Sequence, residues 1–220
     1  MFVIERILQK CYTENLPIIL VGNAQEARRL ITVRFLGYIK EIDSYRSIVF
    51  YKFKPFFPLF IFKNNNNIKA IFSISSENSY ETILKVKEID THELWTSFPN
   101  NFYVARPIRI EPNPKKPVLL YVLGKNDATN LCDVINISEK GICFVSPREY
   151  VVNNQYGFTI ILPDQFGVIT CYGEIKYKKQ ENNGFNRYGV ELFIHAKDKS
   201  VIARYIMNRE KEIMEMLRGF

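Results

Sequence analysis

Apolar residues in the first dozen positions recur every three or four residues, which is the spacing of one face of a helix. These apolar positions are Val3, Ile4, Ile7, Leu8 and Cys11. Asn15 and Pro17 then predict the end of the helix, because a residue that precedes proline is pushed out of helical geometry. The chain is therefore expected to begin with one short amphipathic helix.

From residue 17 to about 98 the pattern changes to short runs rich in β-branched and aromatic residues, which predict strands. The predicted strands are Ile18–Val21, Thr32–Ile39, Ser47–Phe53, Leu59–Phe62, Ile68–Ile74 and Ile83–Ile89. Gly22-Asn23 marks one predicted turn, and Asn64–Asn67 marks another because asparagine tolerates a positive φ. Many short strands with hairpin-length loops favour an antiparallel barrel or sandwich over a βαβ sheet.

A proline-rich stretch between Thr96 and Pro117 interrupts the strand pattern. Proline cannot donate a hydrogen bond to a sheet, so this stretch indicates a linker or a sheet edge. We place a domain boundary here. Residues 1–100 are expected to form one domain, 101–116 an arginine-containing linker, and 117–220 a second domain.

The second half of the chain repeats the strand pattern and ends in a helical one. Its predicted strands are Val118–Leu123, Leu131–Asn136, Ile142–Ser146, Gly157–Leu162, Val168–Lys178 and Tyr188–Ile194. After His195 the apolar spacing becomes helical, with Asp198 or Ser200 as the predicted N-cap. The predicted fold class is mainly β: two small antiparallel β-barrels with a short N-terminal and a C-terminal helix.

The composition and net charge of the chain indicate what kind of protein it is and which partners it favours. The chain has 220 residues, of which 47% are hydrophobic and 14% aromatic, and this excludes a disordered chain. The net charge of +7 favours anionic partners such as nucleotides, nucleic acid or lipid headgroups. No apolar run approaches the roughly 20 residues that span a bilayer, and the charged N-terminus is unlike a signal peptide, so we expect a cytoplasmic protein.

Metal sites and catalytic motifs are missing from the sequence. Its four cysteines form no CxxC pair, so zinc-site spacing is absent and free thiols in a reducing compartment are the simpler expectation. There is no GxSxG, HExxH, P-loop or strand–GxGxxG–helix pattern. We therefore expect no enzyme activity and no cofactor.

Two segments carry side chains suited to binding an anionic purine nucleotide. Arg106 and Arg109 lie in the linker, and guanidinium groups pair with phosphate and stack on nucleobases. Asn136, Ser138 and Gly141 lie where two predicted strands meet. An amide and a hydroxyl can bind the edge of a base, and glycine permits a close approach of the backbone.

The second segment, Asn136-x-Ser138-x-x-Gly141, resembles the (Asp/Asn)-x-Ser-x-x-Gly signature of PilZ domains, bacterial receptors for cyclic di-GMP. The resemblance covers about residues 103–218. It includes an arginine lead-in, which is the segment with Arg106 and Arg109 before the first strand of the second domain. It also includes a closing strand Tyr188–Phe193 and a following helix. The preceding β half resembles, through architecture, the N-terminal domain of flagellar-brake proteins.

The resemblance implies the ligand, the site and the partners. Arg106 and Arg109 would grip phosphate and stack on guanine, while Asn136, Ser138 and Gly141 would contact guanine edges and backbone. Binding of cyclic di-GMP would reorient the two domains and change the surface offered to an unidentified protein partner, with the flagellar motor as a candidate. The process implied is motility or surface behaviour.

One departure from the family pattern keeps an alternative open. The family lead-in is Arg-x-x-x-Arg, whereas this chain has Arg106-x-x-Arg109. If Arg109 is the second arginine of the pattern, Ala105 occupies the first position; if Arg106 is the first, Ile110 occupies the second. The alternative is a degenerate PilZ-type adaptor that binds proteins without nucleotide. A third reading, a basic barrel that binds single-stranded nucleic acid through aromatic rings, is disfavoured because the aromatics mostly alternate within strands.

Overall fold

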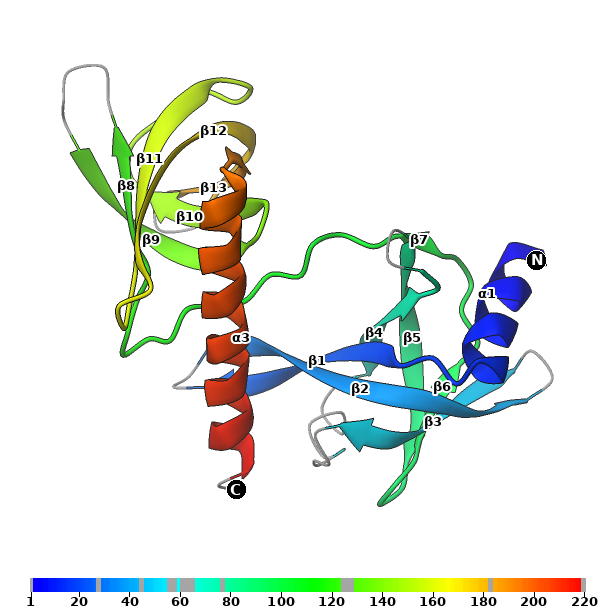
Figure 1. Ribbon diagram of the computed structural model, residues 1–220. Helices are drawn as coiled ribbons and strands as arrows, with labels where there is room; N and C mark the ends of the chain where they lie inside the picture. The colour runs from blue at the N-terminus through cyan, green and yellow to red at the C-terminus, as the bar shows by residue number, and fades with distance from the viewer. Residues whose placement is uncertain are drawn as a thin grey trace. The chain divides into compact units, whose positions relative to one another are not determined.

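The structure is a computed structural model that describes residues 2–26, 29–43, 46–54, 59, 66–75, 78–123, 129–181 and 184–218 (Figure 1). The predicted strand Leu59–Phe62 and the predicted turn Asn64–Asn67 lie largely outside the described residues. The chain divides into two compact units, Met1–Arg106 with Met214–Phe220, and Pro107–Ile213. The first division between the units falls between Arg106 and Pro107.

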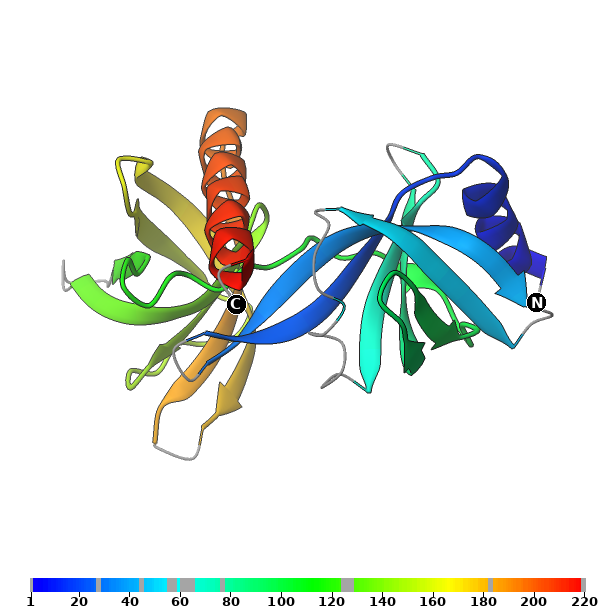
Figure 2. The same cartoon turned by 90° about the horizontal axis from the view of Figure 1, so that it is seen from below.

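The first unit is a closed antiparallel β-barrel with a leading helix. Its elements are α1 (Phe2–Thr13), β1 (Ile18–Glu26), β2 (Arg29–Asp43), β3 (Ser47–Lys54), β4 (Asn67–Ser73), β5 (Ser79–Ile89), β6 (Leu94–Ser97) and β7 (Tyr103–Val104). The strand order is β4-β1-β2-β3-β6-β5, and β4 pairs with β5 to close the ring. The curvature of these blue-to-green strands is visible in Figures 1 and 2.

The predicted N-terminal helix is present, and one predicted turn is wrong. Ile7, Leu8 and Cys11 of α1 are buried, as their helical spacing requires. The turn expected at Gly22-Asn23 does not form, because both residues lie inside β1 and pair with β2. A long strand hydrogen-bonded on both residues overrides the local turn preference of a Gly-Asn pair.

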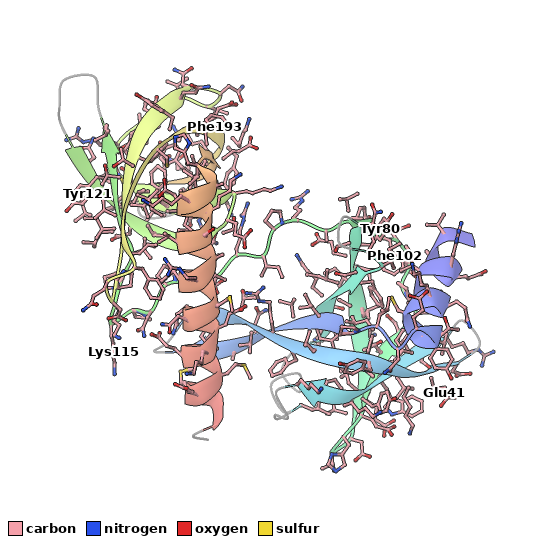
Figure 3. All side chains as sticks on the ribbon, in the orientation of Figure 1. Glu41, Tyr80, Phe102, Lys115, Tyr121 and Phe193 are labelled. Carbon is pink, nitrogen blue, oxygen red and sulfur yellow. The ribbon has the colours of Figure 1, made fainter. Side chains whose placement is uncertain are left out.

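The first part of the proline-rich segment is fixed to the first barrel rather than free. Strand β7 pairs with β5, and the Ala105 N–H donates to the Ser79 carbonyl at 2.9 Å. The Phe102 ring packs edge-on against Phe72, with centroids 5.1 Å apart, and against Tyr80 at 6.4 Å (Figure 3). Strands β6 and β7 were not predicted from the sequence.

The second unit is another closed antiparallel barrel, followed by a long helix. Its elements are β8 (Leu119–Leu123), β9 (Thr129–Ser138), β10 (Gly141–Ser146), β11 (Gln155–Leu162), β12 (Gly167–Gln180), β13 (Asn186–Phe193) and α3 (Ala196–Arg218). The strands close in the order β10-β13-β12-β11-β8-β9. The predicted fold class, two small antiparallel barrels with an N-terminal and a C-terminal helix, is confirmed.

Aromatic rings fill the second barrel. Phe144 is fully buried and contacts Tyr150, Phe158 and Tyr188, with ring centroids between 5.3 and 6.3 Å away. Phe144, Phe158 and Tyr188 lie in strands predicted from the sequence, whereas Tyr150 lies in the connection between β10 and β11. Together the four rings form part of the core of this barrel. Helix α3 begins at Ala196, so the predicted N-caps Asp198 and Ser200 lie inside its first turns.

Phe144→Ala should destabilise the protein by about 3–5 kcal/mol, because it removes a buried ring and leaves a cavity among three other aromatics. Urea unfolding followed by circular dichroism measures this change. Val168→Ala is the matched control, since Val168 is 62% exposed and should change stability by less than about 0.5 kcal/mol. Equal losses for the two variants would contradict the assignment of Phe144 to the core.

Stability should fall as the pH rises from about 10 to 12. Burial raises the pKa of Tyr150 to about 12, and the nearby Cys132 adds to the rise. An unfolded tyrosine has a pKa near 10, so between these values the folded state holds a proton that the unfolded state has lost. Tyr150→Phe should therefore lose less unfolding free energy between pH 9 and 11 than the wild type, whereas the exposed Tyr172→Phe should behave like the wild type.

Candidate functional site

A pair of backbone hydrogen bonds places Arg109 beside the predicted site residues of β9. The Ile110 N–H donates to the Ile137 carbonyl at 2.9 Å, and the Ile137 N–H donates back to the Ile110 carbonyl at 3.0 Å. The two residues form an antiparallel bridge, so the residue before Ile110 lies next to the residue after Ile137. Arg109 is consequently a neighbour of Ser138, and its side chain is exposed.

Ser138 and Gly141 face each other across a two-residue loop and shape the hairpin between β9 and β10. Ser138 is only 3% exposed, and its hydroxyl donates to the Gly141 carbonyl at 3.2 Å. A Cβ at Gly141 would lie 2.5 Å from the backbone carbonyl oxygen of Val190 on β13. Glycine at 141 is therefore required for the close approach of β10 to β13, and Ser138 fixes the loop geometry.

A β-bulge turns Asn136 to the outer face of the barrel. Asn136 pairs with Cys143 and Val134 pairs with Phe144, which leaves Ile135 as an extra residue in β9. The bulge puts Asn136 on the face opposite to the buried Phe144. Its side-chain Oδ1 is buried and has no hydrogen-bond partner among the described residues. This oxygen can accept a hydrogen bond from an N–H group of a bound molecule.

A second β-bulge, in β12, turns the Tyr177 side chain to the outer face of the barrel. Ile175 pairs with Val190 and Tyr177 pairs with Gly189, so Lys176 is the extra residue. The Tyr177 ring crosses the backbone at Gly189, where an added Cβ would overlap the ring carbon Cε1. Its hydroxyl contacts the Cys143 thiol at an O···S distance of 3.3 Å. One row on the outer face therefore runs Tyr177, Gly189, Cys143, Asn136 across four strands.

Positive charge from Arg109 and Arg187 acts on the Tyr177 hydroxyl. Burial raises the pKa of Tyr177 above its usual value, contact with the Cys143 thiol adds to the rise, and the positive charges of Arg109 and Arg187 oppose it. Arg187 also forms an ion pair with Glu181 at 2.7 Å. A half-exposed aromatic ring flanked by two guanidinium groups is a surface on which a nucleobase can stack and a phosphate can be neutralised.

Four of the five predicted site residues lie in one unit, and the fifth does not. Arg109, Asn136, Ser138 and Gly141 gather at the β9–β10 hairpin and the segment that pairs with it. Arg106 is the last residue of the first unit before the boundary, and its backbone N–H lies 3.4 Å from a carboxylate oxygen of Glu81.

Sequence reasoning missed Tyr177 and treated Gly189 only as part of a closing strand. Nothing in the strand pattern marks Tyr177, because regular alternation from the buried Ile175 would point it into the core. The glycine within Tyr188–Phe193 was the available signal, since glycine inside a strand often marks a close approach.

The structure also bears on metal sites, cysteine pairing and membrane-spanning helices. In the described ranges, no group of three or more histidine, cysteine or acidic residues is placed to hold a metal ion. All four cysteines are free and buried. Neither α1 nor α3, over the residues described, is long and apolar enough to cross a membrane.

Residues 113–208 match the family model of the PilZ domain. The chain contains a PilZ domain. This domain covers β8 to β13 and most of α3, and it includes Asn136, Ser138 and Gly141. Arg109 lies four residues before it, in the lead-in segment that pairs with β9. The resemblance inferred from the Asn-x-Ser-x-x-Gly pattern is thereby confirmed.

Several solved structures resemble the chain as a whole. They include the K. pneumonia MrkH–c-di-GMP complex, with 14% identity, a TM-score of 0.45, and coverage of 100% of this chain and 96% of MrkH. Escherichia coli YcgR in complex with c-di-GMP has 14% identity, a TM-score of 0.46, and coverage of 99% and 94%. The Bacillus subtilis inhibitor of motility MotI has 14% identity, a TM-score of 0.43, and coverage of 89% and 96%. No curated protein sequence matches the chain.

Gly189→Ala should destabilise the PilZ domain by about 1–3 kcal/mol, because the new methyl group would clash with the Tyr177 ring and displace it. In a Tyr177→Ala background the same change should cost much less, since the ring is gone. Urea unfolding of the wild type, the two single variants and the double variant gives the coupling free energy. Additive losses would contradict the packing of Tyr177 over Gly189.

Proposed function

We propose that this protein is a bacterial cyclic di-GMP receptor that binds the dinucleotide on the outer face of its PilZ barrel and on the arginine lead-in. The observation that carries the proposal is the Ile110–Ile137 backbone pair, which brings Arg109 to the Ser138–Gly141 hairpin. PilZ domains are the family to which this combination of lead-in arginine and hairpin motif belongs. A receptor of this kind needs no catalytic group, and we assign it none.

Each side chain has a distinct role in the proposed complex. Arg109 neutralises a phosphate or stacks on guanine, and its exposure leaves it free to do so. The Oδ1 of Asn136 lacks a hydrogen-bond partner among the described residues, and it accepts a hydrogen bond from a guanine N–H when the side chain turns toward the ligand. Ser138 and Gly141 keep the hairpin in the shape that this contact requires. Arg106 supplies the second guanidinium when the linker closes over the ligand.

We infer that the signal is a change in the relation between the two domains. The arginines lie on the segment that joins the barrels, so a ligand that grips them restricts that segment. The surface presented to a protein partner then differs between the free and the bound states. Motility or surface behaviour is the process we assign, with the flagellar motor as the candidate partner.

The arginine spacing supports a second candidate function, an adaptor that binds proteins without nucleotide. In an extended chain, side chains four residues apart lie on the same face and those three apart lie on opposite faces. Arg106 and Arg109 are three apart, so a fully extended lead-in would present only one of them to the barrel. An adaptor would retain the fold and the hairpin but have lost the ligand.

Arg109→Ala should weaken cyclic di-GMP binding by about tenfold to more than a hundredfold, because one charge-assisted contact contributes about 1.5–3 kcal/mol. Isothermal titration calorimetry measures the affinity. Arg204→Ala is the matched control, since it removes the same charge from an exposed position of α3 in the same unit. Wild-type protein that shows no heat and no thermal shift at about 100 μM ligand would refute the receptor function.

Ala105→Arg separates the receptor from the adaptor, because it restores the four-residue spacing to Arg109. A receptor should gain affinity modestly from the added guanidinium. An adaptor should go from no binding to measurable binding in the same titration. If neither the wild type nor the Ala105→Arg variant binds cyclic di-GMP, the lead-in arginines have no role in nucleotide binding.

A further inference from the structure

Helix α3 carries a buried guanidinium that the proposed ligand contacts do not use. Arg209 is only 2% exposed. Its Nε donates to the backbone carbonyl of Glu111 at 3.1 Å, and one terminal nitrogen donates to the Glu212 carboxylate at 3.3 Å. Glu111 is two residues after Arg109, so the buried charge fastens the lead-in segment to the helix.

Glu212 extends this attachment to the start of the barrel. Its Oε2 accepts a hydrogen bond from the Asn113 side-chain amide at 3.1 Å, and its Oε1 accepts one from Asn208 at 3.4 Å. Asn113 also orders the turn that follows, since its side-chain oxygen accepts the Lys115 N–H at 2.9 Å. The lead-in is thus held to α3 at two points, Glu111 and Asn113.

Both attachments lie on the same side of Arg109 as the backbone pair with Ile137. Ile110 is 2% exposed and Pro112 is buried, so the segment between the two attachments is packed as well as hydrogen-bonded. A buried guanidinium is costly to leave unpaired, so Arg209 strongly favours the arrangement in which Glu111 is within reach. The first residue beyond this fixed segment, on its N-terminal side, is Arg109.

We propose that Arg209 is a positioning residue for the nucleotide site: through Glu111, and with Glu212 and Asn113, it holds the lead-in against the barrel so that Arg109 stands beside Ser138. This inference rests on the proposed function for its ligand, but the positioning itself exists without ligand. It assigns α3 a role in affinity although none of the ligand contacts proposed above lies on the helix.

The contact between α3 and Glu111 and the binding of ligand at Arg109 are thermodynamically linked, so each strengthens the other. If the hold of α3 on Glu111 strengthens ligand binding at Arg109, then bound ligand strengthens the hold on α3 by the same free energy. Occupancy of the nucleotide site is thereby communicated to the helix that ends the chain. The Glu111 carbonyl and the Glu212 carboxylate, both within the second unit, are contacts of Arg209 through which this coupling would act.

Two variants test the attachment. Arg209→Met keeps most of the buried volume and removes both donors. Asn113→Asp keeps the oxygen that accepts the Lys115 N–H but replaces the donor to Glu212 with a second carboxylate, so it remains a test if Arg209→Met fails to fold. Met207→Ala and Arg204→Ala, at exposed positions of the same helix, are the controls.

The first measurement is amide hydrogen exchange of the full chain without ligand. The Ile110 and Ile137 amides should exchange at least about tenfold faster in both variants, whereas the amides that join β11 to β12 should keep wild-type rates. The controls should leave all these amides unchanged. Unchanged exchange at Ile110 and Ile137 in both variants would overturn the positioning role, whatever the protein binds.

The second measurement is the cyclic di-GMP affinity, with and without Arg109. If the released segment is in position about a tenth of the time, the dissociation constant rises about tenfold. In an Arg109→Ala background, Arg209→Met should cause no further loss, because it acts through Arg109. An equal loss in both backgrounds would overturn the inference. A wild type that does not bind cyclic di-GMP refutes the receptor function instead, and the exchange data still decide the positioning.

Discussion

The arrangement of the candidate site depends on one pair of backbone hydrogen bonds, between Ile110 and Ile137. Pro107, Pro112 and Pro114 interrupt the lead-in, and this pair joins the Ile110 N–H between them to the edge of β9, beyond the end of β8. Both side chains are buried at the joint, which shields the hydrogen bonds from water. Without this pair, the contacts of Glu111 and Asn113 with α3 would still hold the lead-in, but no backbone hydrogen bond would join it to β9 next to Ser138.

Regular pairing builds the barrel, and the irregularities in its strands shape the candidate binding surface. Two bulges, at Ile135 and Lys176, interrupt strands whose regular alternation would direct Asn136 and Tyr177 into the aromatic core. Gly141 and Gly189 lie between them, one allowing β13 to approach and the other seating the Tyr177 ring. The outer face thereby collects an amide and an aromatic ring beside a lead-in arginine, on strands that are held by the core beneath.

Helix α3 links this surface to the end of the chain. Its apolar side packs in the ordinary way, with Tyr205 edge-on to Phe166 at 5.7 Å. Arg209 and Glu212 instead reach the lead-in, where a buried charge is satisfied by a carbonyl and a carboxylate. The helix therefore packs on the barrel and also holds the segment that follows Arg109, which is the basis of the positioning role proposed for Arg209.

The sequence by itself determined the fold class and the identity of the hairpin motif, because strand alternation and turn residues act locally. It did not reveal β6 and β7. These strands are short, and they form because they pair with the longer strands β3 and β5. It placed a turn at Gly22-Asn23, where long-range pairing prevailed. Tertiary structure alone decided that Arg109 meets Ser138, that bulges turn Asn136 and Tyr177 outward, and that Arg209 holds the lead-in, because each depends on contacts between residues far apart in the chain.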